Sequence, residues 1–260
     1  MTDVFKANQD AWNKQSALAT SPWVQPVDAE TISRARNGDW QLILTPAKEV
    51  PPAWFGDVKG QRILALASGG GQQVPVLAAA GATVVSFDAS RVQLEKDQFV
   101  ADREQLTLRC ELGDMADLSR FTADSFDLIF HPTSNVFCAD IEPVWQHCAR
   151  VLRPGGRLLS GFMNPDFFMF DHEEIEKGGE LKVSFRLPFR DIDHLTAAAI
   201  KRRGEAGYAL EFSHSLDAQI GGQLKAGFQL ADFYEDRWSN DATPLNEFMP
   251  TSMATLAIRT

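Results

Sequence analysis

The stretch ILALASGGGQQ, residues 63–73, decides the fold. Residues 63–67 are an uncharged apolar run, which predicts a buried strand, and glycines 69–71 follow it directly. A helix is expected over residues 72–80, ending at Gly81. A strand, a glycine turn and a helix in this order are typical of a βα unit in which the backbone closely approaches a ligand. Glycine also occurs in βα turns without a ligand, so this stretch alone leaves both interpretations open.

Short apolar runs alternate with amphipathic segments along much of the chain, a pattern that favours βαβ units and a parallel sheet. Further helices are expected at residues 91–104, 141–152 and 216–226, and a turn at 153–156. Strands are expected at residues 63–67, 83–87, 106–111, 126–130, 157–162, 228–235 and 254–258. The pattern predicts an α/β fold with a doubly wound, mostly parallel, seven-stranded Rossmann-like sheet.

Two segments do not follow the alternation. Residues 1–60 are rich in Trp and Pro and predict an N-terminal helical cap ahead of a main domain at 61–260. Residues 163–214 are less regular and predict an insertion after the fifth strand, with strands at 181–187 and 208–213.

The charge balance disfavours polyanionic partners. The chain has 25 basic and 35 acidic residues and a formal net charge of −10, which opposes binding to nucleic acid or to an anionic membrane. Apolar stretches end well before the roughly 20 residues that span a bilayer, and the N-terminus lacks the apolar core of a signal peptide. We therefore expect a cytoplasmic protein without nucleic-acid or membrane partners, as a monomer or homodimer.

Cysteine and histidine spacing favours neither disulfides nor a metal site. Cys110, Cys138 and Cys148 are odd in number and form no C-x-x-C pair, so reduced thiols are expected. His131, Cys138 and His147 match no zinc pattern. The acidic run 171–180 is typical of a solvated face. No metal is predicted.

Five segments, taken in order, resemble the successive motifs of class I S-adenosylmethionine-dependent methyltransferases. They are ILALASGGG (63–71), VVSFDAS (84–90), GDMADL (113–118), SFDLIFH (125–131) and VLRPGGRLL (151–159), and they cover roughly residues 60–162. The resemblance implies that S-adenosylmethionine is the cofactor and that a methyl group passes directly, in line, to a small-molecule acceptor.

The resemblance also implies cofactor-binding residues. The loop beneath the methionine and ribose parts would be Ala67, Ser68, Gly69, Gly70 and Gly71. Asp88 would accept the two ribose hydroxyls, and Asp114 with Met115 would contact the adenine, since a carboxylate suits hydroxyl and amine donors. Alternatively, Asp88 caps the following helix and Asp114 caps a short turn.

The sequence departs from the family pattern at the first strand. Ala65 stands where an acid is common, and Ala67 replaces the first loop glycine. Loop carbonyls, or groups around His131, would then hold the methionine amino group, and an altered cofactor or weak activity stays open. His131 ends the fourth strand, where it is a candidate general base or cofactor-pocket residue. The alternative is that it only hydrogen-bonds the loop, because methyl transfer often needs little beyond alignment.

Aromatic residues are candidates for enclosing the site. Those that follow the fifth strand would wall an acceptor pocket, and Trp12 and Trp40 would form a lid. Core packing is the competing explanation for both sets. The residues after the fifth strand are Phe162, Phe167, Phe168 and Phe170.

Two other functions compete with methyl transfer. One is a regulatory protein that binds S-adenosylmethionine without turnover, which the loss of the acid at Ala65 motivates. The other is a nicotinamide-dependent oxidoreductase. Val74 stands where that fingerprint needs a small residue, and neither Tyr208 nor Tyr234 has a lysine four residues later, so the second alternative is disfavoured.

Overall fold

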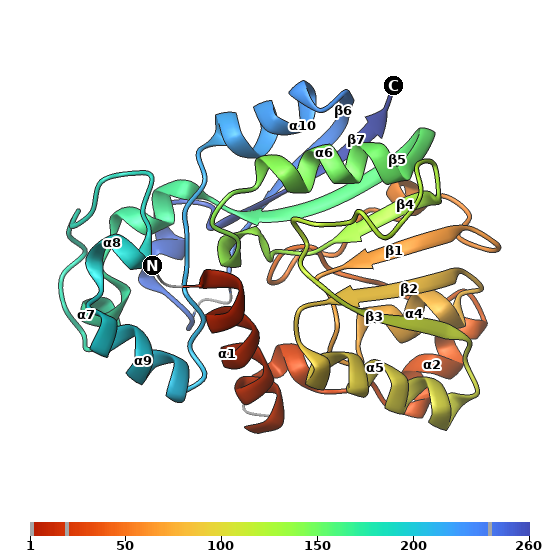
Figure 1. Ribbon diagram of the computed structural model, residues 1–260, viewed down its shortest axis with the longest axis horizontal. Coiled ribbons are helices and arrows are strands. Elements are labelled where there is room, and N and C mark those ends of the chain that lie inside the picture. Colours follow the sequence, from red (N-terminus) through yellow and green to blue (C-terminus); the bar gives the residue numbers. More distant parts are fainter. Residues whose placement is uncertain (1–2, 19–20, 239–240) are drawn as a thin grey trace.

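The computed structural model describes residues 3–18, 21–238 and 241–260, so positions 1–2 and 19–20 of the predicted cap lie outside the described residues. Its centre is one seven-stranded sheet of order β3-β2-β1-β4-β5-β7-β6 (Figure 1). The strands are β1 (Arg62–Leu66), β2 (Thr83–Asp88), β3 (Leu108–Leu112), β4 (Phe126–His131), β5 (Leu152–Met163), β6 (Phe228–Asp236) and β7 (Ser252–Arg259). The first five strands pair in parallel, and β7 runs antiparallel to both β5 and β6. The predicted doubly wound, mostly parallel sheet is confirmed.

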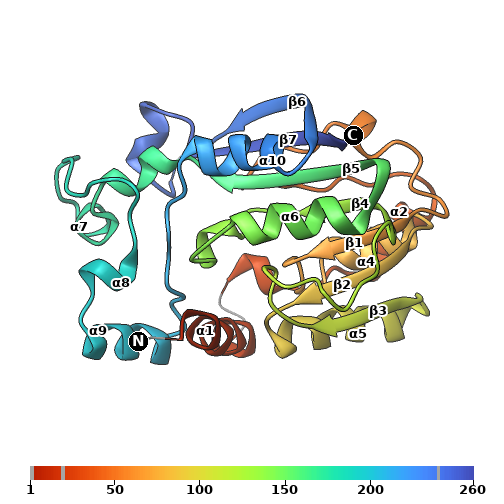
Figure 2. The ribbon, with the colours of Figure 1, turned by 45° about the horizontal axis from the view of Figure 1, so that its top comes forward.

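Helices cover both faces of the sheet, as Figures 1 and 2 show. The α-helices are α1 (Val4–Leu18), α2 (Ala29–Arg36), α3 (Pro52–Phe55), α4 (Gln73–Ala79), α5 (Arg91–Glu104), α6 (Glu142–Val151), α7 (His172–Glu176), α8 (Asp191–His194), α9 (Ala197–Glu205) and α10 (Gly222–Lys225). Short 3-10 turns lie at Pro22–Val24, Asn135–Phe137, Pro165–Met169 and Pro244–Glu247, and a π turn at Asp217–Gly221 precedes α10. None of the described helices is long and apolar enough to cross a membrane.

Side chains alternate between the two faces of each strand, so the sheet has an apolar core on each face. Ile63 and Leu128 face the core beneath α2, α3 and α4, whereas Leu64 and Ile129 face the core beneath α6. Covering both faces explains why the parallel strands are apolar on both sides.

The predicted turn at 153–156 lies inside β5 as a bulge. Phe126 of β4 pairs with Leu152, but Leu128 pairs with Arg157, so four residues of β5 stand opposite the single residue Asp127 of β4 and loop out between two paired positions. Gly155 adopts φ +72°, which a glycine accommodates without strain.

The insertion after β5 is present, but the strands predicted at 181–187 and 208–213 are wrong. Each segment makes only an isolated bridge, Phe170 with Val183 and Arg190 with Phe212, because neither meets a continuous strand edge. The charged link between them instead folds into α8 and α9. The side chain of Thr196 accepts a hydrogen bond from the Ala199 N–H, and the alanines that begin α9 favour a helix.

The N-terminal segment is fixed to the sheet by its backbone. The Leu44 carbonyl accepts hydrogen bonds from the backbone N–H and the hydroxyl of Thr133, both at 2.9 Å, at the end of β4. The same carbonyl packs on Gly161 of β5, where an added Cβ would lie 2.1 Å from its oxygen. Gly161 therefore permits the cap to lie directly on the sheet.

We expect Gly161→Ala to lower the free energy of unfolding by about 1–3 kcal/mol, because the new methyl group displaces backbone rather than a flexible side chain. Gly204→Ala is the matched control, since an added Cβ there has no neighbour within 4 Å and replaces a helical glycine. Urea denaturation of both variants checks this. Equal stability of the two variants would contradict the packing described.

Candidate functional site

A cavity of about 1120 Å³ lies where the parallel strands end. One part of its wall comes from segments that follow β1, β2, β3 and β4, namely Ala67–Gly69, Asp88–Ala89, Gly113–Ala116 and Pro132–Ser134. The opposite part comes from α1 and the insertion, which gather at this edge of the sheet in Figure 1 (left). The carboxyl edge of an open α/β sheet is the usual place for a ligand.

The glycine loop adopts a conformation that few side chains tolerate. Gly70 and Gly71 have φ values of +133° and +80°, and a Cβ on Gly70 would lie 2.8 Å from the Trp23 carbonyl oxygen. Ala67 also has a positive φ, +50°, at the position where the resemblance places a glycine. Its N–H donates to the Phe87 carbonyl at 2.7 Å, which ties the loop to β2. The backbone therefore turns sharply at the cavity wall.

Asp88 binds the glycine loop directly. Its carboxylate accepts hydrogen bonds from the Gly69 N–H at 3.0 Å and from the Ser90 N–H at 2.8 Å, and it lines the cavity. Burial raises the pKa of Asp88 to about 6, against the opposing effect of these hydrogen bonds. The N-cap of α5 is Ser90, whose hydroxyl accepts from the Gln93 N–H, so the helix-cap interpretation of Asp88 is wrong.

A second buried carboxylate, Asp97 of α5, was missed in the sequence. It accepts from the Gly71 N–H at 2.7 Å and from the Ser86 hydroxyl at 2.6 Å. Burial raises its pKa to about 7. The available signal was its spacing, because Asp97 falls on the same helical face as Leu94 and Ala101, both buried.

Asp114 and Met115 line the cavity beyond β3. Asp114 accepts from the Ala116 N–H at 2.9 Å, so it also forms the short turn that the alternative interpretation expected. A turn carboxylate keeps lone pairs free for a second donor. The two interpretations are compatible, and the adenine role stays a prediction.

Four buried polar atoms on residues that line the cavity lack a partner within the described part of the chain. They are the Ser68 hydroxyl, the Gln73 amide oxygen, the Arg203 Nε and the Trp238 indole N–H. Buried polar groups are rarely left unpaired, so these atoms fit a ligand that supplies carboxylate and amino groups, as S-adenosylmethionine does. Ala65, by contrast, is fully buried in the apolar core beneath α4 and does not line the cavity.

His131 lies beneath the cavity wall and does not line it. It is fully buried, with Nδ1 3.0 Å from the Leu66 carbonyl and Nε2 2.8 Å from the Asn135 amide oxygen. Asn135 in turn donates to Gln219 of the π turn at 2.9 Å. Burial lowers the pKa of His131. Burial outweighs the two oxygen acceptors, which favour the charged ring, so the neutral ring is favoured, and its contacts support the loop after β4. The base role stays a prediction.

The aromatic residues divide between cavity and core. Phe167, Phe168 and Trp12 line the cavity, whereas Phe162 is fully buried and outside the lining. Trp12 packs edge-on against Phe137 at 5.0 Å between ring centroids.

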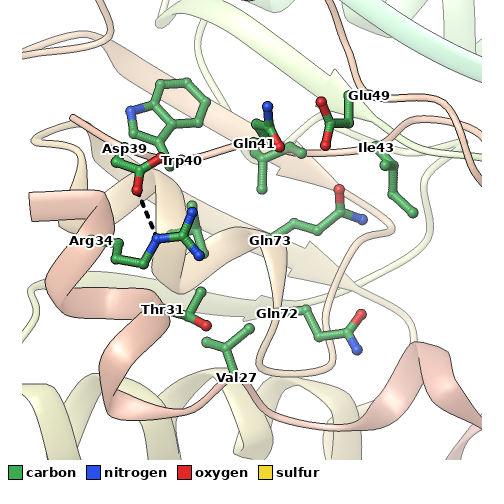
Figure 3. Close-up of a pocket in the computed structure, with 12 residues that line it drawn as sticks. Val27, Thr31, Arg34, Asp39, Trp40, Gln41, Ile43, Glu49, Gln72 and Gln73 are labelled. Carbon is green, nitrogen blue, oxygen red and sulfur yellow. Dashed lines mark hydrogen bonds and ion pairs between the residues drawn. The ribbon is translucent and has the colours of Figure 1, made fainter.

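Trp40, in contrast, packs edge-on on Phe55 at 5.0 Å and lines a separate, smaller pocket of about 320 Å³. Figure 3 shows this pocket between α2 and α4, with the Arg34–Asp39 ion pair at its rim. Gln72 and Gln73 line both pockets. A lid role for Trp40 over the main cavity is therefore wrong.

Comparison with known proteins identifies the family. A model described as "Methyltransferase domain" matches residues 64–160. The chain belongs to the class I S-adenosylmethionine-dependent methyltransferases, and its methyl donor is S-adenosylmethionine. The relative that carries this assignment is the Uncharacterized methyltransferase YbaJ of Bacillus subtilis (strain 168), which is 44% identical over 259 residues, 100% of both chains. The family assignment disfavours the regulatory and nicotinamide alternatives.

Solved structures share the fold. An S-adenosylmethionine dependent methyltransferase from Mesorhizobium loti matches with a TM-score of 0.60 at 17% identity, over 80% of this chain and 94% of that one. Magnesium protoporphyrin IX methyltransferase (ChlM) from Synechocystis PCC 6803, with bound SAH, matches with a TM-score of 0.58 at 13% identity, over 99% and 100%. These identities support the fold alone.

We expect Asp97 to make the protein less stable as the pH rises from about 4 to 7. The folded state keeps the Asp97 proton up to about pH 7, whereas the unfolded chain loses it near the ordinary value of 3.8. The free energy of unfolding of the wild type relative to Asp97→Asn should therefore decrease through this range. Urea denaturation of both proteins across the range measures the difference, and a constant difference would contradict the shift.

Proposed function

We propose that the chain transfers a methyl group from S-adenosylmethionine to a small-molecule acceptor within the main cavity. The observation that carries the proposal is that one continuous cavity is bounded by the glycine loop, Asp88 and Asp114 on one side and by α1 and the insertion on the other. S-adenosylmethionine supplies a methyl group activated by its sulfonium charge.

The sheet side of the cavity is the proposed donor half. Asp88 is already oriented by two backbone N–H groups, and its remaining lone pairs would accept the two ribose hydroxyls. Asp114 and Met115 would contact the adenine, and the loop Ala67–Gly71 would pass beneath the ribose and methionine. The unpartnered Ser68 hydroxyl and Trp238 indole would hold the methionine end, in place of the acid missing at Ala65.

The helix α1 and the insertion form the proposed acceptor half. The side chain of Asn8 on α1 donates to the carbonyls of Phe137 and Leu210 and accepts from the Leu210 N–H at 2.7 Å. It thus joins the segment after β4 to the insertion, over the end of the sheet. An enclosed site excludes water and holds the acceptor in line with the methyl group. Alignment then accounts for transfer without a covalent intermediate, and His131 would support the loop rather than act as a base.

This proposal gives separate roles to the predicted parts of the chain, which are a cap at residues 1–60, a domain at 61–260 and an insertion at 163–214. The domain would bind the donor, while the cap and the insertion would enclose the acceptor. The contacts of Asn8 support such a division of roles.

The affinity for S-adenosylhomocysteine should depend on Asp88 in its charged form. We expect Asp88→Asn to weaken binding by about tenfold or more, because two charge-assisted hydrogen bonds to the ribose are weakened. In the wild type, binding should weaken as the pH falls below about 6, since protonation removes acceptor capacity. Calorimetric titration at several pH values measures both effects.

Glu95→Gln is the matched control, because Glu95 is exposed on the same helix that follows Asp88. It should leave the affinity unchanged. Unaltered binding by folded Asp88→Asn would remove Asp88 from the donor site and contradict the proposal.

A further inference from the structure

Glu211 lies in the acceptor half of the cavity, on the segment that follows α9. Its neighbours in sequence fix its backbone. The backbone of Leu210 is hydrogen-bonded to the Asn8 side chain, and the Phe212 N–H donates to the Val136 carbonyl at 2.8 Å. The Glu211 N–H donates to the Asp191 carboxylate at 2.9 Å. Its side chain therefore projects into the cavity from a segment held against the loop after β4.

The Glu211 carboxylate has no hydrogen-bond or ion-pair partner among the residues that the structure describes. Burial, together with the nearby Asp191 carboxylate, raises its pKa to about 7, although Arg203 acts in the opposite direction. A buried carboxylate without a partner is costly for stability, and such groups are found where a ligand or a reaction uses them.

The charge around Glu211 favours a basic ligand. The Arg203 guanidinium is 2.5 Å from Glu173 and 4.0 Å from Asp191, and Lys177 is 2.7 Å from Glu174, so both cations of this wall have carboxylate partners. The Nε of Arg203 is the one part of these two groups that is buried without a partner among the described residues. The same wall also carries apolar and aromatic side chains, including those of Trp12, Phe167, Phe168 and Ile175. A developing oxyanion would be repelled here, whereas a developing cation would be stabilised.

We propose that the methyl acceptor is an amine on an apolar, ring-sized body, and that Glu211 binds its nitrogen. This inference rests on the proposed function and names the substrate class of the same cavity. The surplus of acidic groups opposes an acceptor carboxylate or phosphate, although the Arg203 Nε could donate to one, and an alcohol gains less from the charged wall.

The chemistry balances with Glu211 as proton acceptor. The bound ammonium first gives one proton to the Glu211 carboxylate. The lone pair of the resulting neutral amine forms the new N–C bond, while the methyl C–S bond breaks and its electron pair stays on sulfur. The products are the methylated ammonium, S-adenosylhomocysteine and the proton, which Glu211 passes to solvent.

Three probes of matched shape and different charge test the substrate class. They are 1-naphthylmethylamine, 1-naphthalenemethanol and 1-naphthoate, titrated calorimetrically into the full chain saturated with S-adenosylhomocysteine. We expect the amine to bind about tenfold tighter than the alcohol, and the anion to bind weakest, because only the amine forms a charge-assisted bond with Glu211. An amine that fails to bind, or binds no tighter than the alcohol, overturns the inference.

Variants of Glu211 assign the preference to this side chain. Glu211→Gln should abolish the amine's advantage without changing the affinity for the alcohol, and Glu211→Asp should restore part of it. Glu205→Gln, an exposed acid on α9, is the control and should behave like the wild type. An amine preference that survives in Glu211→Gln overturns the inference, whereas failure of the wild type to bind S-adenosylhomocysteine removes the proposed function itself.

Discussion

The site depends on two buried carboxylates that hold the glycine loop by its backbone. Asp88 accepts from the Gly69 N–H and Asp97 from the Gly71 N–H, so alternate amides of one turn are fixed from β2 and from α5. These hydrogen bonds keep the loop in a conformation with positive φ values at Gly70 and Gly71, which an isolated chain would not hold. This sharp bend of the backbone therefore forms one wall of the cavity.

Holding a loop in this way has an electrostatic cost. Burial raises the pKa of both carboxyls, and the Asp88 charge contributes to the rise at Asp97. Asp88, which lines the cavity, is nevertheless oriented by N–H donors, so a ligand meets a carboxylate that needs no rearrangement. Glu211 differs from both. Its pKa is also raised, but its carboxylate accepts no hydrogen bond from the described residues. Its orientation toward the cavity marks the acceptor half as chemically distinct from the donor half.

The enclosure is built from segments far apart in the chain. Asn8 of α1 bonds both the loop after β4 and the insertion, and Gln9 donates to the Ala89 carbonyl at 3.0 Å after β2. The helix α1 thus contacts both the proposed donor half and the proposed acceptor half.

Local pattern predicted the sheet and the glycine loop, because strand and helix periodicities and βα turn chemistry are properties of neighbouring residues. The resemblance to the methyltransferase motifs singled out Asp88 and Asp114, and the structure brings both to the cavity. Only tertiary packing decided that Asp97 reaches the loop, that His131 is buried beneath the wall and that Glu211 faces the cavity. The insertion shows the same limit, because residues 181–187 alternate like a strand but meet no strand edge. Such outcomes depend on partners distant in the sequence, which periodicity does not encode.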